Sequence, residues 1–212
     1  MSDNGIRLIC FDAGGVLVRI CRTWEDGCAA AGLPFRERDH SEPASSRRRD
    51  LHRSYQCGLI DGASYLAGLA ATSAGAYTPD EVRLVHDAWI LGEYDGARQL
   101  VADLHDAGLV TGVLSNTNES HWSIMGPQRS TVVFDVHHPH ASHLLGHVKP
   151  DEKIFRAFEA ATAHGPSQIL FFDDLADNVE AAKAAGWHAH QVDHEGDPPG
   201  DMRAHLAYLG LI

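Results

Sequence analysis

The sequence predicts an α/β fold with a doubly wound parallel sheet and a helical domain inserted into it. Two observations favour this class. Short apolar runs alternate with helical patterns over the second half of the chain, which is typical of a parallel sheet with helices on both faces. Residues 19–94 instead hold several helical patterns and no convincing strand. We therefore expect a sheet domain of residues 1–18 and 95–212 and a helical domain of residues 19–94.

The elements of the sheet domain follow one another in a regular order. The first strand is expected over residues 6–11, an apolar run. A helix is expected over residues 97–108, where apolar residues recur at helical spacing. The remaining elements are a strand at 109–115, a helix at 151–165, a strand at 168–174, a helix at 176–186 and a last strand at 187–192.

The inserted domain shows four helical patterns, at residues 23–33, 45–58, 61–71 and 78–92. The fourth begins with a strong start signal. Thr78 is a good N-cap residue, Pro79 suits the first turn, and Glu81 completes a capping box.

Composition excludes several classes of protein. The formal net charge of −12 argues against a nucleic-acid-binding or membrane-surface protein, since both depend on basic surfaces. The four cysteines lie within the first 57 residues without CxxC spacing, which indicates reduced thiols. No signal peptide and no apolar stretch long enough to span a membrane is apparent. We expect a cytoplasmic location.

Polar residues stand where the predicted strands end. Asp12 follows the first strand, Ser115 ends the strand at 109–115, and the pair Asp173 and Asp174 ends the strand at 168–174. Lys149 lies just ahead of a helix. Ligands of such sheets bind beyond the carboxyl ends of the strands, so we expect these side chains to meet.

Together these residues have the chemistry that phosphoryl transfer requires. A transferring phosphate needs cations and hydrogen-bond donors around its oxygens, which Lys149 and Ser115 supply. Mg²⁺ prefers carboxylate oxygens, which the acidic residues supply. A carboxylate such as Asp12 can also attack phosphorus and form an acyl phosphate.

Four motifs, "FDAGGVLV", "LSNTN", "KPDEKIF" and "FFDDLADNVEAAKAAGW", carry these residues in order. In this the chain resembles the haloacid dehalogenase superfamily. It is most similar to the α-helical-cap subgroup that contains sugar-1-phosphate phosphatases and the N-terminal phosphatase domain of soluble epoxide hydrolases. The resemblance spans essentially the whole chain and implies a Rossmann-like core with a helical cap.

The resemblance also implies a role for each residue. Asp12 would be the nucleophile and a Mg²⁺ ligand, and the backbone carbonyl of Gly14 a second ligand. Ser115 and Lys149 would hold the phosphate, with the Asn116 backbone N–H as a further donor. Asp173 would bind the metal, with Asp174 supporting it directly or through water. The implied function is Mg²⁺-dependent hydrolysis of a small soluble phosphomonoester, sugar phosphates first, through an aspartyl-phosphate.

Gly14 departs from the pattern of the superfamily, which places a second aspartate there as general acid and base. The cap or a water could supply the proton, the leaving group could need little help, or the protein could be a weak enzyme that only binds a phosphorylated ligand. A phosphotransferase or mutase is an alternative. So is a metal-independent dehalogenase, which the acid pair at 173–174 disfavours.

Three further clusters allow two interpretations each. The histidines at 137–147 suggest a polar surface loop leading to Lys149 more than a second metal site. The basic stretch 45–53 suggests a solvated helix face more than a substrate contact. For a group of four aromatic residues, a place in the core of the cap is favoured over a substrate platform: Trp24, Tyr55, Trp89 and Tyr94.

Overall fold

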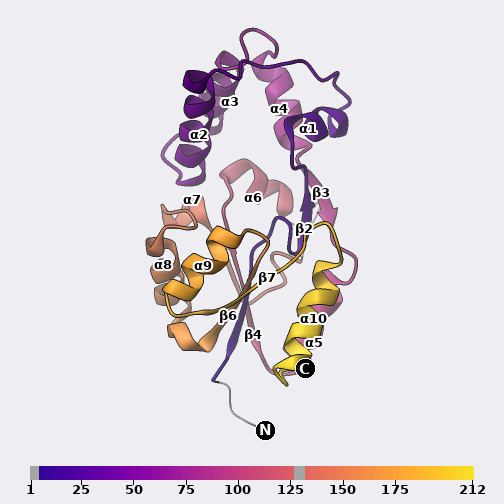
Figure 1. Ribbon diagram of the computed structural model, residues 1–212, viewed down its shortest axis with the longest axis vertical. Coiled ribbons are helices and arrows are strands. Elements are labelled where there is room, and N and C mark those ends of the chain that lie inside the picture. Colours follow the sequence, from indigo (N-terminus) through magenta and orange to yellow (C-terminus); the bar gives the residue numbers. More distant parts are fainter. Residues whose placement is uncertain (1–4, 127–131) are drawn as a thin grey trace.

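The computed structural model describes residues 5–126 and 132–212. Figure 1 shows two parts stacked along the long axis, with helices α1–α4 in one and the sheet with its helices in the other. The alternation of strands and helices predicted for the second half of the chain is confirmed.

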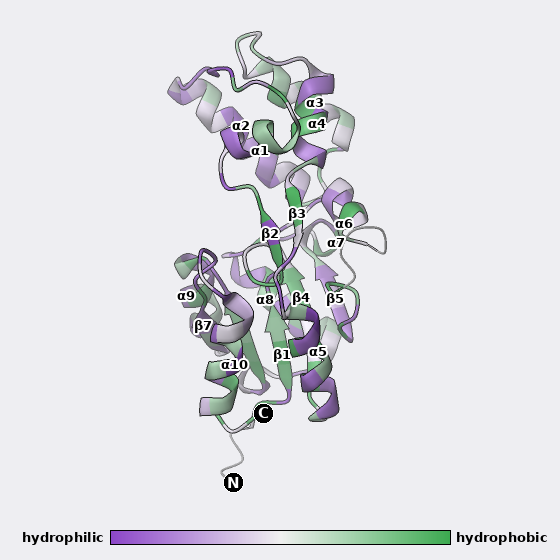
Figure 2. Ribbon diagram, turned by 90° about the vertical axis from the view of Figure 1, so that its right-hand side faces the viewer, coloured by the Kyte–Doolittle hydropathy of each residue, from purple (hydrophilic) through white to green (hydrophobic). Residues whose placement is uncertain are grey.

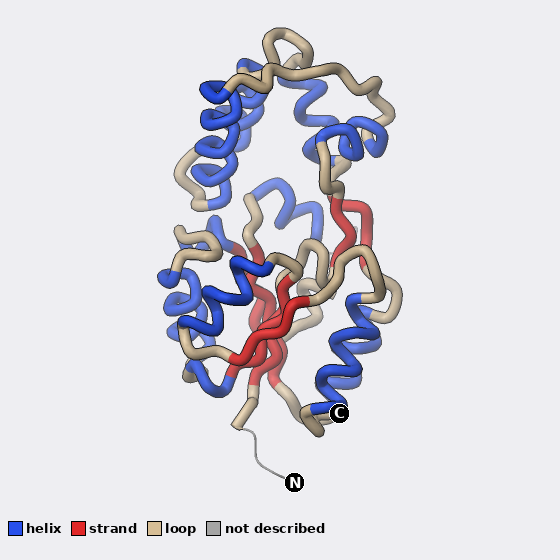
Figure 3. Tube along the Cα trace, in the orientation of Figure 1, coloured by secondary structure: helices blue, strands red, loops and turns tan. Residues whose placement is uncertain are grey.

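The sheet has five parallel strands in the order β5-β4-β1-β6-β7. Helices lie on both of its faces (Figure 3). The strands are β1 Leu8–Phe11, β4 Val110–Ser115, β5 His138–Ala141, β6 Ile169–Asp173 and β7 His188–Gln191. The helices are α5 Ala97–Asp106, α6 Glu119–Met125, α7 Ser142–Leu145, α8 Glu152–Thr162, α9 Ala176–Ala184 and α10 Pro198–Tyr208, with a 3₁₀ turn at Pro166–Gln168.

The central strand β1 shows why the fold forms. Alternate residues of a strand point to opposite faces. Ile9 and Phe11 belong to one buried cluster together with residues of α5 and α10. Leu8 and Cys10 belong to a second cluster with residues of α8 and α9. Both faces are therefore buried, and the strand is a continuous apolar run, as Figure 2 shows for the sheet.

The cap consists of the four predicted helices, α1 Trp24–Ala30, α2 Glu42–Gln56, α3 Gly62–Ala71 and α4 Pro79–Asp87. The capping box of Thr78 and Glu81 is confirmed. The cap has a buried cluster of its own, separate from the two clusters of the sheet domain: Cys28, Tyr55, Tyr65, Leu69, Ala70, Tyr77, Val82 and Val85.

Two expectations about strands were wrong. Residues 19–94 do contain strand: β2 Val18–Ile20 and β3 Ile90–Glu93 form an antiparallel ribbon between the cap and the sheet. These strands are too short to show a periodic pattern. The histidine-rich segment is not a loop, because its residues 138–141 form the edge strand β5. Histidine is tolerated there since an edge strand is only half covered. The domain boundaries at 18 and 95 stay a prediction.

Helix α10 was not predicted. It begins with Pro198 and Pro199, and Asp197 caps it. Within the described residues no helix is long and apolar enough to cross a membrane. All four cysteines are free thiols, as predicted.

Candidate active site

A buried cluster of charges lies at the carboxyl ends of β1 and β6. Nζ of Lys149 is 3.0 Å from Oδ1 of Asp12 and 2.7 Å from Oδ2 of Asp173. All three side chains are buried. The sequence predicted that these residues meet, and the structure brings them into direct contact.

Asn116 fixes the position of Lys149. Its side-chain oxygen accepts a hydrogen bond from the backbone N–H of Lys149 at 2.8 Å, and its amide donates to the Lys149 carbonyl at 2.9 Å. Asn116 directly follows β4, so the lysine segment is tied to the end of this strand. The sequence had assigned Asn116 a role in phosphate binding through its backbone N–H. Its side chain has this additional role in positioning.

The electrostatics of the cluster reflect its burial. Burial raises the pKa of Asp12 to about 7, against the lowering influence of Lys149. Burial also disfavours the charged form of Lys149, but Asp12 and Asp173 outweigh this effect and raise its pKa to about 12. Lys149 is therefore a permanent cation at neutral pH.

The two acids of the pair have different surroundings. Both oxygens of Asp173 accept hydrogen bonds, from the backbone N–H of Leu175, the amide of Asn178 and Nζ of Lys149. Oδ2 of Asp174 lies 2.8 Å from Nη1 of Arg22 and 3.6 Å from Nδ1 of His194.

Among residues 5–126 and 132–212, one group of three or more acidic, His or Cys side chains is arranged to hold a metal ion. It consists of Asp12, Asp173 and Asp174, each with a ligand atom within 4.8 Å of the others. The described histidines around β5 form no such group. His137 accepts a hydrogen bond from the Thr111 backbone instead.

The loop after Asp12 depends on two glycines. A Cβ at Gly14 would lie 2.9 Å from Cδ1 of Ile20, so the place of the family's second aspartate is occupied by an apolar side chain. Gly15 has a φ of +83°, and a Cβ there would lie 2.3 Å from Nη2 of Arg22 and 2.7 Å from Oδ2 of Asp174. Gly15 thus makes room for the Arg22–Asp174 ion pair.

Gly15→Ala should destabilise the protein by about 1–3 kcal/mol through backbone strain alone. A second cost should be added to this strain, because the Arg22–Asp174 ion pair must move to make room for the new Cβ. The matched control is Gly75→Ala, at φ +81° with no atom within 4 Å of the added Cβ. Urea unfolding of both variants separates the two costs. An equal loss of stability in both would mean that the contact with Arg22 and Asp174 adds nothing.

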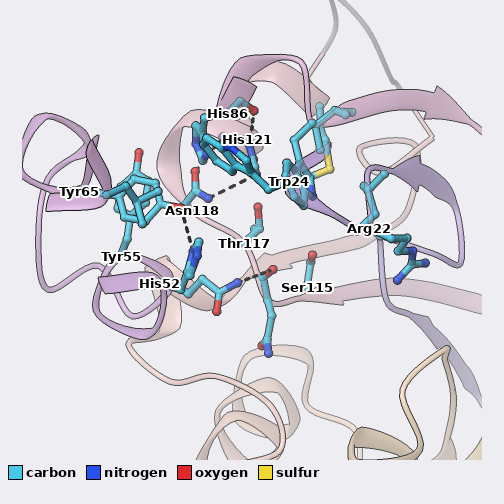
Figure 4. A pocket seen from close by; sticks show the side chains of 18 of the residues that line it. Arg22, Trp24, His52, Tyr55, Tyr65, His86, Ser115, Thr117, Asn118 and His121 are labelled. Carbon is cyan, nitrogen blue, oxygen red and sulfur yellow. Dashed lines mark hydrogen bonds between the residues drawn. The ribbon is translucent and has the colours of Figure 1, made fainter. Parts of the chain in front are cut away.

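A cavity of about 390 Å³ lies between the cap and the sheet domain. Gly14, Ser115 and Asn116 belong to its wall, so these predicted site residues face the same space. Figure 4 shows Ser115 and Thr117 on one side and a group of aromatic and imidazole rings on the other. The other lining residues are Ile20, Arg22, Trp24, Arg38, His52, Tyr55, Gln56, Tyr65, Leu69, His86, Trp89, Ile90, Thr117, Asn118, His121 and Met125.

The expectations for the cap are partly right. Tyr55 is in the cap core and Trp24 and Trp89 pack against it, but all three also line the cavity. Tyr94 belongs to the core of the sheet domain instead, which corrects its assignment to the cap.

The basic stretch 45–53 shows the same mixture of roles. Arg47 and Arg49 are exposed as predicted. Arg48 is buried and donates to the carbonyls of Asp39 and Thr72, and His52 lines the cavity.

Sequence reasoning missed Arg22, Arg38 and His194. Arg22 and His194 reach Asp174 from segments 152 residues before it and 20 after it, and no local pattern marks such contacts. The position of Arg22 two residues after the ribbon strand β2 was an available signal, but it could be used only if that strand was recognised.

Comparisons with known proteins agree with this geometry. Residues 6–186 match the family model of haloacid dehalogenase-like hydrolases. The chain is 30% identical over 216 residues to phosphatase MT3486 of Mycobacterium tuberculosis, with 98% of this chain and 96% of the relative covered.

Solved structures of similar fold include two from other bacteria. HAD family enzyme BT-2542 of Bacteroides thetaiotaomicron, in a magnesium complex, has a TM-score of 0.76 at 21% identity, covering 94% of this chain and 99% of that one. The same enzyme is known with magnesium and inorganic phosphate. A HAD-like hydrolase of Porphyromonas gingivalis has a TM-score of 0.74 at 22% identity, covering 95% and 98%. The chain belongs to the haloacid dehalogenase-like hydrolases.

Proposed function

We propose that the protein is a Mg²⁺-dependent phosphatase that hydrolyses a small phosphomonoester through an aspartyl-phosphate on Asp12. The observation that carries this proposal is the buried contact of Asp12 with Lys149, with a second acid, Asp174, within metal-binding distance. The similarity to a phosphatase and to a fold crystallised with magnesium and phosphate supports it.

The donor set fits a hard divalent cation. Asp12 and Asp174 offer carboxylate oxygens, and Gly14 would add its backbone carbonyl. When bound, Mg²⁺ would neutralise charge on the phosphate oxygens.

The contacts favour Asp174 over Asp173 as the direct ligand, because both oxygens of Asp173 are hydrogen-bonded, whereas the ion pairs of Asp174 involve one oxygen, Oδ2. Asp173 would then hold Lys149 in place. This reverses the order that the sequence suggested for the pair.

The residues of the chain would divide the reaction between them. Oδ1 of Asp12 accepts hydrogen bonds from the Ala13 backbone at 2.7 Å and from Lys149. Oδ2 has no partner among the described residues and is the oxygen that we assign to attack phosphorus. Lys149, the Ser115 hydroxyl and the Asn116 backbone N–H would hold the phosphate. Water would then hydrolyse the aspartyl-phosphate and release Asp12.

Because position 14 carries no acid, the leaving group must depart without protonation from that side. We expect kcat/KM to rise as the pKa of the leaving alcohol falls. Alkyl phosphates should be about 10²–10⁴-fold poorer substrates than 4-nitrophenyl phosphate, which is the usual worth of a general acid. A series of substituted phenyl and alkyl phosphates measures the dependence. Equal rates along the series would show that another group donates the proton.

Phosphate release from a panel of phosphorylated metabolites tests the proposed function. Release should require Mg²⁺ and stop in EDTA. The family resemblance favours sugar phosphates, and they stay in the panel beside aryl phosphates and nucleotides. Transfer of phosphate to an added alcohol in place of water would indicate a phosphotransferase. Halide release from haloacids in EDTA would indicate a dehalogenase. Absence of all three activities in folded protein would overturn the proposal.

A further inference from the structure

The cavity that Gly14, Ser115 and Asn116 share with the cap has mostly apolar and aromatic walls. Four large rings line it, those of Trp24, Tyr55, Tyr65 and Trp89. The rings of His86 and His121 stack with centroids 3.8 Å apart (Figure 4). Burial lowers the pKa of His86 to about 2 and also lowers that of His121, so both imidazoles are neutral. Such walls suit the face of a flat ring.

Arg38 is a cation of this cavity without an acidic partner. Its guanidinium lies 4.4 Å over the ring of Trp24, and no carboxylate of residues 5–126 or 132–212 pairs with it. Arg22, which also lines the cavity, is by contrast paired with Asp174. Burial, and secondly the nearby Arg48, disfavour the charged form of Arg38 and lower its pKa. In a chain of net charge −12 this is an unusual local excess of positive charge.

Two polar atoms of the cavity residues are also unpartnered. Nε1 of Trp24 and Nε2 of His86 are buried and have no hydrogen-bond partner within the described part of the chain. His86 is 6% exposed. A buried polar atom left unpaired is costly, so a ligand group that reached either atom would stabilise the complex. The Trp24 N–H is a donor only, so such a group would have to be an acceptor.

We propose that the cavity binds the organic part of the substrate, and that this part is a flat ring bearing an anionic group that pairs with Arg38. This inference rests on the proposed phosphatase function, since it describes the leaving group of that reaction. Hexose phosphates fit less well, because they offer neither an aromatic face nor a second charge. A carboxylate is the simplest group that satisfies Arg38.

Pairs of aryl phosphates that differ only in the charge of one substituent test whether Arg38 recognises an anionic group. Wild type and Arg38→Met are compared on 3- and 4-carboxyphenyl phosphates and on the corresponding carbamoylphenyl phosphates. The carbamoyl group replaces the anionic carboxylate by a neutral substituent on the same ring. Leaving-group effects cancel when the carboxy-to-carbamoyl ratio of kcat/KM is compared between enzymes. We expect Arg38→Met to lower this ratio by about 10–100-fold for at least one isomer, the usual worth of a charged hydrogen bond.

Two further variants control the result. Arg49→Met removes an exposed cap arginine, paired with Glu42, that does not line the cavity, and should leave the ratio unchanged. Arg38→Lys keeps the charge and should retain part of the preference. An unchanged ratio in folded Arg38→Met, for both isomers, would overturn the anionic part of the inference.

Product binding tests the same inference without turnover. Calorimetry compares 4-hydroxybenzoate with its amide and with 4-hydroxycyclohexanecarboxylate. The hydroxybenzoate should bind about tenfold or more tightly than either, and Arg38→Met should remove its advantage over the amide. Equal binding of the flat and saturated acids would overturn the inference that the ligand carries a flat ring. This result stands even if no phosphate ester is hydrolysed, so failure of the inference and of the proposed function are distinguishable.

Discussion

Replacing Asp12 by asparagine should lower turnover by about 10⁴-fold or more, because an amide cannot form the aspartyl-phosphate. The substitution is nearly isosteric. It also leaves Lys149 paired with the other buried acid, Asp173, at 2.7 Å. The variant should therefore fold as well as wild type. Initial rates with Mg²⁺ and thermal unfolding curves measure both effects.

Asp80→Asn is the matched control, since this aspartate is in the first turn of α4 with a side chain 92% exposed. It should retain full activity. Substantial turnover in folded Asp12→Asn would exclude Asp12 as the nucleophile and require another group to attack the phosphate.

Replacing Lys149 by methionine should reduce kcat/KM by about 10³-fold, because the transferring phosphate loses its buried cation. It should also cost about 3–5 kcal/mol of stability, since Asp12 and Asp173 remain buried without compensation. The methionine side chain fills most of the space of the lysine, so lost packing contributes little. Progress curves and urea unfolding in EDTA measure the two losses.

The pH dependence of this stability loss identifies its cause. The pKa of Asp12, already raised to about 7 by burial, should rise further without Lys149. When the pKa of a carboxyl is higher in the folded than in the unfolded protein, the carboxyl destabilises the fold fully at a pH above its folded pKa. At a pH below its unfolded pKa this cost is absent, because the group is protonated in both states. The variant should therefore be closer to wild type at pH 5 than at pH 8. A loss independent of pH would indicate a packing defect instead.

The sequence was sufficient for the central strands β1, β4 and β6 because these strands are buried on both faces. The apolar runs at 6–11 and 168–174 have no other good interpretation, and both became strands. The polar residues at their ends could then be placed at one edge of the sheet, since parallel strands share that direction. Asp12 and Asp173 meet there through Lys149.

The errors have a common physical origin, which is that short or exposed elements carry little pattern. The ribbon of β2 and β3 has only three and four residues per strand. The half-covered strand β5 is rich in histidine. The different surroundings of Asp173 and Asp174 arise from contacts with distant residues such as Arg22, which spacing along the chain does not reveal.

Trapping the phosphorylated enzyme tests the central claim most directly. The protein with Mg²⁺ is mixed with a labelled substrate from the panel, quenched in acid within milliseconds, digested and mapped by mass spectrometry. We predict a phosphorylated peptide with the phosphate on Asp12, absent in EDTA and absent in Asp12→Asn. Mg²⁺-dependent phosphate release without any label on Asp12, under quenching fast enough to precede turnover, would contradict the account.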